Sequence, residues 1–245
     1  MTDHLERRRF RLQETYATVI AEPRFMELAE RAITAARGEI EAYIADRPCF
    51  RTALEPLAVE AGAPEVVRRM AAAAARAGVG PMAAVAGAIA QKTIEALVAA
   101  GAAHAVMDNG GDIVFFIDRP VTVGIFTGPA AIRDIALRFL PRPEIFSVCT
   151  SSGTVGHSLS FGRADAATVI AGDGYLADAV ATALGNRVKN DQESEIEQAI
   201  RSSLIDGVEG LLVVAGARLG LGGIVPEIVR AHVETNIISQ GKSLR

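Results

Sequence analysis

The longest apolar stretch of the sequence runs from Met82 to Ala100, and its only charged or amide side chains are Gln91, Lys92 and Glu95. These three share one side of a helix. The many alanines and glycines make the stretch a poor membrane span. A helix that is apolar around most of its surface is buried in a protein core. Since half of the 245 residues are hydrophobic, the sequence predicts one large domain or two closely packed halves.

The charge balance narrows the range of partners. With 25 basic and 29 acidic residues, the formal net charge is −4, which gives no broad positive field for nucleic acid or an anionic membrane. A small molecule or another protein is the favoured partner. Cys49 and Cys149 are too few for a disulfide framework or a cysteine zinc site, so a reducing compartment is expected. Residues 1–10 carry charges where a signal peptide has an apolar run, and we expect a cytoplasmic protein.

The periodicity of the first hundred residues predicts mainly helices. Apolar residues alternate like those of a half-exposed strand over 10–20 and recur at helical spacing over 23–44. Residues 51–60 are compatible with one or two short strands broken at Pro56. A second helix is predicted over 64–77, ended by Gly78, and the buried helix follows.

The rest of the sequence predicts mixed α and β structure. We expect tight-turned strand pairs among residues 104–108, 113–117 and 121–126, while 129–140 suit either a helix or a twisted strand. Strands are predicted over 145–149, 166–171 and 211–215, helices over 175–188 and 192–205, a glycine-rich turn over 220–223, and a loosely held polar end.

Asp178 and Thr182 lie one helical turn apart in a stretch made otherwise mostly of alanine and aliphatic residues. Their carboxylate and hydroxyl can therefore converge on one point. Oxygen donors of this kind suit magnesium, which often completes its coordination with water and substrate phosphates. Alternatively, Thr182 bonds back to its own helix and Asp178 only caps or solvates it.

Two small-residue loops precede this pair. Asn109, Gly110, Gly111 and Asp112 separate two apolar strands, where paired glycines form a hairpin turn or let backbone amides approach a ligand.

The second loop contains Thr150, Ser151, Ser152 and Gly153, whose hydroxyls and amides suit anionic oxygens, although such loops are also common on surfaces. His157 follows it and is the candidate proton carrier, or else a solvated side chain.

The order N-G-G-D, T-S-S-G and A-D-A-V-A-T-A-L resembles that of the ApbE-type flavin transferases, in which a G-G-[DN] turn, a T-S-G loop and an A-D-A-x-x-T helix follow one another. The resemblance covers residues 78–190. The run from Gly156 to Asp165 is similar to that of a smaller ApbE-like side family.

The resemblance implies an α+β, T-fold-like domain spanning residues 1–245, with an internally duplicated sheet-and-helix unit. It further implies FAD or FMN at the loops of residues 109–112 and 150–153, and magnesium on Asp178 and Thr182. Family members transfer FMN from FAD to a protein threonine, and some hydrolyse FAD to FMN and AMP. The partners that this resemblance implies are a flavin or nucleotide ligand and a protein acceptor. Self-association stays open.

The sequence also departs from the family pattern. Val79 and Ala84 stand where the family has the lysine and aspartate of K-G-x-x-x-D, and His157 is all that remains of an H-I-I-D-P segment. Transferase members are exported or lipid-anchored, whereas we expect this protein to be cytoplasmic.

Three hypotheses follow: an ApbE-like protein that binds a flavin or related nucleotide with magnesium and acts at its diphosphate, a flavin-binding accessory protein without catalysis, and a tunnel-fold enzyme acting on purines or pterins. The third lacks a Cys/His zinc set.

Overall fold

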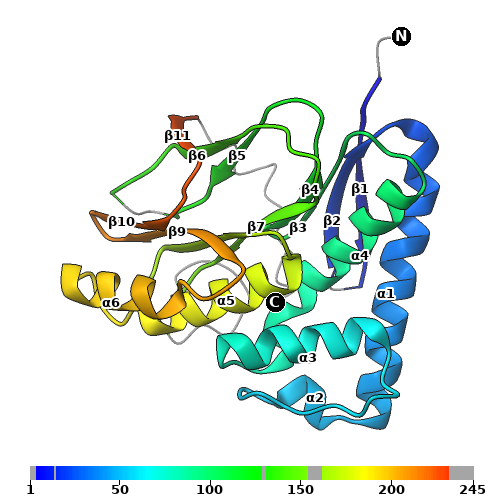
Figure 1. Ribbon diagram of the computed structural model, residues 1–245, viewed down its shortest axis with the longest axis horizontal. Helices are drawn as coiled ribbons and strands as arrows, with labels where there is room; N and C mark the ends of the chain where they lie inside the picture. Colours follow the sequence, from blue (N-terminus) through cyan, green and yellow to red (C-terminus); the bar gives the residue numbers. More distant parts are fainter. Residues whose placement is uncertain (1–3, 14, 129–130, 154–161, 232–245) are drawn as a thin grey trace.

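The computed structural model describes residues 4–13, 15–128, 131–153 and 162–231, and it is built around an eight-stranded antiparallel sheet (Figure 1). Its strand order is β1-β2-β3-β4-β7-β8-β9-β10, and a second sheet has the order β11-β6-β5. The strands are β1 Glu6–Leu12, β2 Thr15–Ala21, β3 Ala105–Asn109, β4 Asp112–Phe116, β5 Val121–Ile125, β6 Ile135–Phe139, β7 Phe146–Ser151, β8 Ala166–Ala171, β9 Val208–Ala215, β10 Arg218–Gly223 and β11 Glu227–Arg230.

The helices cover one face of the large sheet, and the small sheet covers part of the other. They are η1 Pro23–Phe25, α1 Met26–Asp46, α2 Cys49–Thr52, α3 Glu65–Ala77, η2 Pro81–Ala84, α4 Val85–Ala99, α5 Gly174–Arg187 and α6 Glu193–Ser203. The structure is thus mixed α+β, as the sequence predicts.

The central strands of the large sheet are buried on both faces. On β3, Met107 packs towards the helices and Val106 towards the small sheet. On β9, Val213 packs towards the helices and Val214 towards the small sheet. Strands covered on both sides have continuous apolar runs rather than alternating ones. This explains why residues 211–215 consist only of leucine, valine and alanine.

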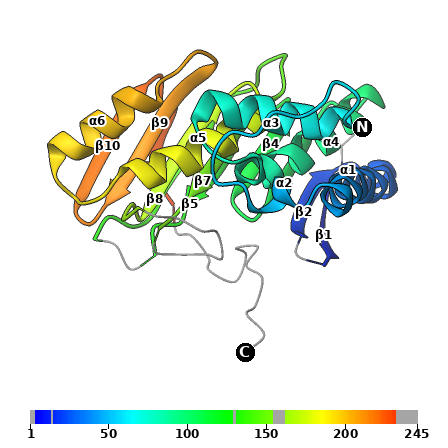
Figure 2. The ribbon, with the colours of Figure 1, turned by 90° about the horizontal axis from the view of Figure 1, so that it is seen from below.

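The predicted buried helix is confirmed as α4, preceded by the single turn η2. In Figure 2, α4 lies between α1 and α5, and it also packs against β3 and β4. Among the described residues, the segment Pro81–Ala99 is the one stretch long and apolar enough to cross a membrane, with a mean hydropathy of 1.3. Half of it is buried inside the protein, as expected for a core helix.

The prediction of one strand over residues 10–20 is wrong, because this region contains a hairpin. Arg11 of β1 lies opposite Tyr16 of β2, and Leu12 lies opposite Thr15. The chain reverses through Gln13, which has a φ of 51°. A left-handed glutamine is uncommon, and no glycine or proline marks the turn in the sequence.

Other boundaries also differ from the predictions. Residues 53–60 form no strand, since α2 is followed by irregular chain. Residues 121–125 form β5, which pairs with β6 in the small sheet rather than with β4. The predicted turn at 220–223 is part of strand β10, whose Gly220 and Gly222 leave room for Ile196 and Ile200 of α6. The ambiguous segment 129–140 contains strand β6.

Candidate functional site

The turn between β3 and β4 has the conformation that its two glycines permit. Gly110 and Gly111 have φ values of 74° and 104°, which side chains with a Cβ rarely adopt. The Gly111 amide donates to Oδ1 of Asp108 at 2.9 Å. Asn109 and Asp112 lie directly opposite each other across the hairpin, so their side chains share the sheet face that the helices cover.

Two of the predicted site residues meet at the first turn of α4. Asn109 Nδ2 donates to the Ala86 carbonyl oxygen at 3.1 Å, and the Gly87 amide donates to Asp178 Oδ2 at 2.8 Å. The N-cap residue of α4 is Ala84, which has no side-chain acceptor. Asp178 of α5 therefore satisfies an amide that an N-cap side chain would normally bind, and it caps α4 rather than its own helix.

The contact between α4 and α5 is unusually close at this point. A Cβ atom on Gly87 would lie 2.1 Å from the Gly174 carbonyl oxygen and 2.8 Å from Asp178 Cβ. The helices also cap each other, because the Gly174 amide donates to Gln91 Oε1 of α4 at 3.0 Å. Gln91 Nε2 in turn donates to Glu95 at 3.0 Å. The position of Asp178 thus depends on a reciprocal pair of hydrogen bonds across two glycines.

Replacing Gln91 with leucine is expected to lower the free energy of unfolding by about 2 kcal/mol, because the buried Gly174 amide loses its acceptor. Urea unfolding followed by circular dichroism measures this change. Thr93→Val is the matched control: Thr93 is equally buried on α4 but bonds only within its own helix, to the Ile89 carbonyl. A loss for Gln91→Leu no larger than that of the control would contradict the capping role.

Asp112 lies near Asp178 and opposite Cys149 in the β4–β7 pair. Burial raises the pKa of Asp112 well above its usual value, and the charge of Asp178 raises it further. Burial also raises the pKa of Asp178 to about 7, against the opposing effect of the Gly87 and Ala86 amides. Both shifts have the direction expected for carboxylates withdrawn from water.

Cys149 belongs to the same cluster, and its surroundings disfavour the thiolate that nucleophilic attack requires. Burial and the charges of Asp112 and Asp178 raise the pKa of its thiol well above the usual value. A neutral buried thiol is a weak hydrogen-bond donor, and here the Cys149 Sγ lies 3.9 Å from the Gly174 carbonyl oxygen.

The Thr150–Gly153 loop begins beside the glycine turn. The Thr150 amide donates to the Gly111 carbonyl at 3.2 Å, whereas the Thr150 hydroxyl lies 3.0 Å from that of Thr168 on the face away from α5. Ser151 faces α5, since a Cβ atom on Gly185 would lie 3.7 Å from its Oγ. Ser152 is partly exposed, and the Gly153 amide donates to the Ala164 carbonyl. His157 lies outside the described residues.

Thr182 follows Asp178 by one turn of α5 and is more exposed than Asp178, whose exposed fraction is 8%. Within the described ranges, no three His, Cys, Asp or Glu side chains are grouped closely enough to hold a metal ion by themselves. A cation at Asp178 would therefore also take oxygens from Thr182, backbone, water or a ligand. Magnesium commonly binds in this way.

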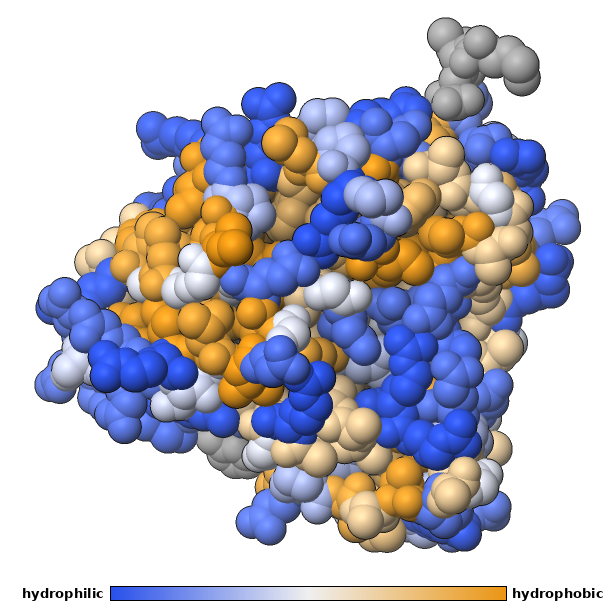
Figure 3. All heavy atoms as spheres, viewed as in Figure 1, coloured by the Kyte–Doolittle hydropathy of each residue, from blue (hydrophilic) through white to orange (hydrophobic). Residues whose placement is uncertain are grey.

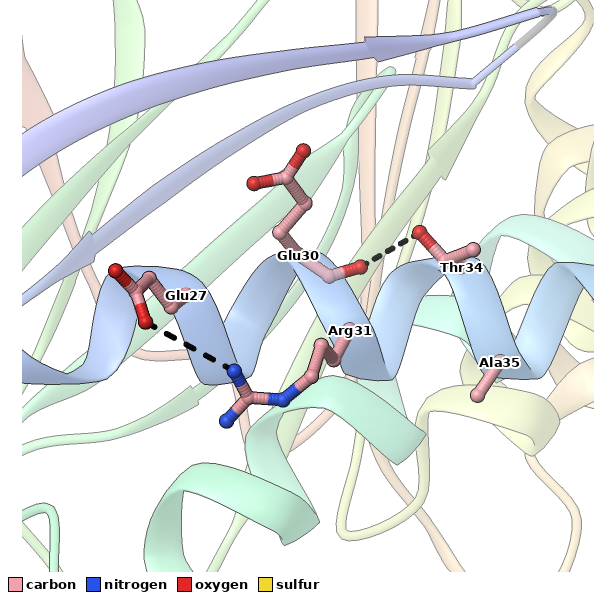
Figure 4. A pocket seen from close by; sticks show the side chains of 5 residues that line it. All are labelled: Glu27, Glu30, Arg31, Thr34 and Ala35. Carbon is pink, nitrogen blue, oxygen red and sulfur yellow. Dashed lines mark hydrogen bonds and ion pairs between the residues drawn. The ribbon is translucent and has the colours of Figure 1, made fainter.

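A separate surface hollow of about 540 Å³ lies on the exposed side of α1 (Figure 4). Two pairs of its lining residues interact: Arg31 pairs with Glu27, and the Thr34 hydroxyl donates to the Glu30 carbonyl. All its lining residues come from this one helix, and none belongs to the predicted site.

Several residues that organise the site were not identified from the sequence. Asp108 holds the glycine turn, Gly87 permits the helix contact, and Cys149 lies against Asp112. Gln91 was noted only as part of a polar side, yet it is 4% exposed. A glutamine in an otherwise apolar helix is a usable signal, because a buried amide requires hydrogen-bond partners.

Comparisons with known proteins give a consistent picture. A family model described as AbpE bacteria matches residues 2–208. A "UPF0280 protein" from Methanocella arvoryzae is 48% identical over 95% of both chains, and one from Methanosarcina acetivorans is 47% identical over 94% of this chain and 92% of its own.

Solved structures show the same fold at low sequence identity. The flavinyl transferase ApbE of Pseudomonas stutzeri, in its apo form, has a TM-score of 0.59 at 17% identity, covering 92% of this chain and 95% of its own. The ApbE protein of Thermotoga maritima has a TM-score of 0.55 at 12% identity, covering 93% and 97%.

Proposed function

This chain belongs to the ApbE-like family whose model is described as AbpE bacteria, and from that premise we propose that it binds a flavin nucleotide together with magnesium at the site around Asp178. The ligand is FAD or FMN. The structural relatives are a flavinyl transferase and a flavin transferase, which supports the flavin. The chemistry of the local donors supports the metal.

The observation that carries the proposal is that two separate segments meet at the first turn of α4 and a third adjoins one of them. The glycine turn contributes Asn109, the Thr150–Gly153 loop adjoins that turn, and α5 contributes Asp178. A structural hairpin would not require its flanking asparagine to bond a distant helix. Backbone amides of glycines and a helix N-terminus suit the anionic oxygens of a phosphorylated ligand.

The residues present also fit a magnesium ion. Burial raises the pKa values of the Asp112 and Asp178 carboxylates, and the charge of Asp178 raises that of Asp112 further. A divalent cation would relieve both effects. Asp178 and Thr182 would hold the ion, and its chemistry there would be to neutralise charge on the diphosphate. The Gly110 amide would orient the anionic oxygens, because the Gly111 and Gly153 amides already donate to Asp108 and to the Ala164 carbonyl.

Cleavage at the FAD diphosphate, or transfer of FMN to a protein acceptor, is the catalytic form of this proposal. In it, His157 would move a proton to or from the reacting oxygen. The alternative is binding without catalysis. It is favoured by Val79 and Ala84, which replace the family's lysine and aspartate and are both buried, so this segment offers no charge to a diphosphate.

Incubating the purified protein with FAD and magnesium, and following flavin fluorescence alongside release of AMP, tests the proposal. Binding that EDTA abolishes is expected. AMP release would support the catalytic form, and binding without AMP the accessory form. No binding of FAD or FMN at millimolar magnesium would contradict both.

A further inference from the structure

Strand β1 carries a row of three exposed arginines on one face. Arg7, Arg9 and Arg11 alternate with the inward-facing Arg8, Phe10 and Leu12. Residues two apart on a strand are about 6.8 Å apart, so the row forms a regular line of positive charge. It stands out on a protein whose net charge is −4.

In the part of the chain that the structure describes, the charges of this row are only partly balanced: the charge of Arg7 acts on the buried Asp108, whereas Arg9 and Arg11 have no carboxylate partner. The residues opposite them on β2 are Ile20, Thr18 and Tyr16, all neutral. Among the described residues, no carboxylate forms an ion pair with Arg7, Arg9 or Arg11; the nearby Glu6 pairs with Arg8 instead. Like charges side by side on a sheet repel one another, so an anionic partner would be stabilising.

The row also lies on an open edge of the sheet. Within the described part of the chain, β1 pairs only with β2, which leaves the backbone groups of its other side available to another strand. Arg11 is held in place by the ring of Tyr16, 5.1 Å from its guanidinium carbon.

Protection of a free edge does not by itself explain the arginines. The opposite edge strand, β10, exposes Leu219 and Leu221 and has no such row. Figure 3 shows apolar surface on the left of the view, the side where β9 and β10 lie. Two edges of one sheet thus differ in chemistry, and only one is cationic.

We propose that the β1 edge binds an extended acidic segment of a partner protein, which adds to the sheet as a further strand. In an added strand, side chains at alternate positions share one face and have the same spacing as the arginines. Acidic residues at every second position would therefore each meet one arginine. The inference goes beyond the flavin proposal and does not depend on it.

Fluorescence anisotropy with a labelled peptide that alternates glutamate and threonine tests this surface. Wild-type protein is expected to bind it at low salt and to lose it as salt rises. The variant Arg7→Gln/Arg9→Gln/Arg11→Gln is expected to bind about tenfold more weakly. Binding should also slow amide hydrogen exchange in β1, because the free edge becomes hydrogen-bonded.

The matched control replaces three exposed arginines elsewhere on the surface, Arg31, Arg51 and Arg201, with glutamine, and it should bind like the wild type. A peptide of the same composition with its glutamates grouped together should bind more weakly. The proposal would be overturned if both peptides bound equally well or if neither bound. It would also be overturned if amide exchange in β1 did not change, or if a single-stranded RNA of similar charge bound more tightly than the peptide.

Discussion

Replacing Gly87 with alanine is expected to lower the free energy of unfolding by about 3 kcal/mol. The new Cβ atom would lie 2.1 Å from the Gly174 carbonyl oxygen, which belongs to the backbone and cannot rotate away. The helices must then separate, which also pulls the Gly87 amide from Asp178. Chemical unfolding measured by circular dichroism gives the size of the loss.

Gly38→Ala is the matched control for this prediction. Gly38 lies on the exposed side of α1, and a Cβ atom there would meet nothing within 4 Å. Alanine in a helix interior is favoured over glycine, so this variant should be more stable by about 0.5–1 kcal/mol. If both alanine variants were equally stable, the close contact between α4 and α5 would not require glycine at position 87.

Most helices of the fold follow from local signals in the sequence. Helix α3 ends at Gly78, whose φ of 75° is the left-handed conformation expected of a terminating glycine, and α4 is as buried as its composition requires. The pairing of β5 with β6 was not predicted, because residues 129–140 suited either a helix or a strand and β5 was therefore expected to pair with the strand before it. Strand β10 was mistaken for a turn because its glycines are required by packing against α6 rather than by backbone reversal.

The order of the motifs predicted which segments belong together but not how they contact one another. Asn109 and Asp178 were identified from the sequence, and both bind the first turn of α4. That turn consists of alanine and glycine, which carry no chemical signal in a single sequence. The hydroxyl of Thr150 was expected to face the ligand but bonds Thr168, since the side of the sheet that it faces depends on strand register.

Replacing Asp178 with asparagine is expected to weaken magnesium-dependent flavin binding about a hundredfold. Asparagine keeps an oxygen that can accept from the Gly87 amide, so the helix contact survives while the negative charge is lost. Isothermal titration of FAD in the presence of magnesium measures the change. Asp46→Asn, at an exposed position near the end of α1, removes the same charge elsewhere and should bind as the wild type does.

The same substitution is expected to stabilise the ligand-free protein at alkaline pH. The pKa of Asp178 is about 7 in the folded protein against an ordinary 3.8, so the folded state binds the proton more tightly than the unfolded state does. Stability is therefore lost as the pH rises from about 4 to about 7, by about 4 kcal/mol at most. Asp178→Asn cannot ionise, and its advantage over the wild type should be present at pH 8 and absent at pH 4.

Magnesium should reduce the difference in stability between these two proteins at pH 8. A bound cation favours the ionised carboxylate and stabilises only the folded state that presents it. Melting temperatures with and without 10 mM magnesium, a concentration of roughly the order that a weak site requires, should rise for the wild type and stay unchanged for Asp178→Asn. An equal rise in both proteins would show that magnesium binds elsewhere, and the carboxylate would then serve only to cap α4.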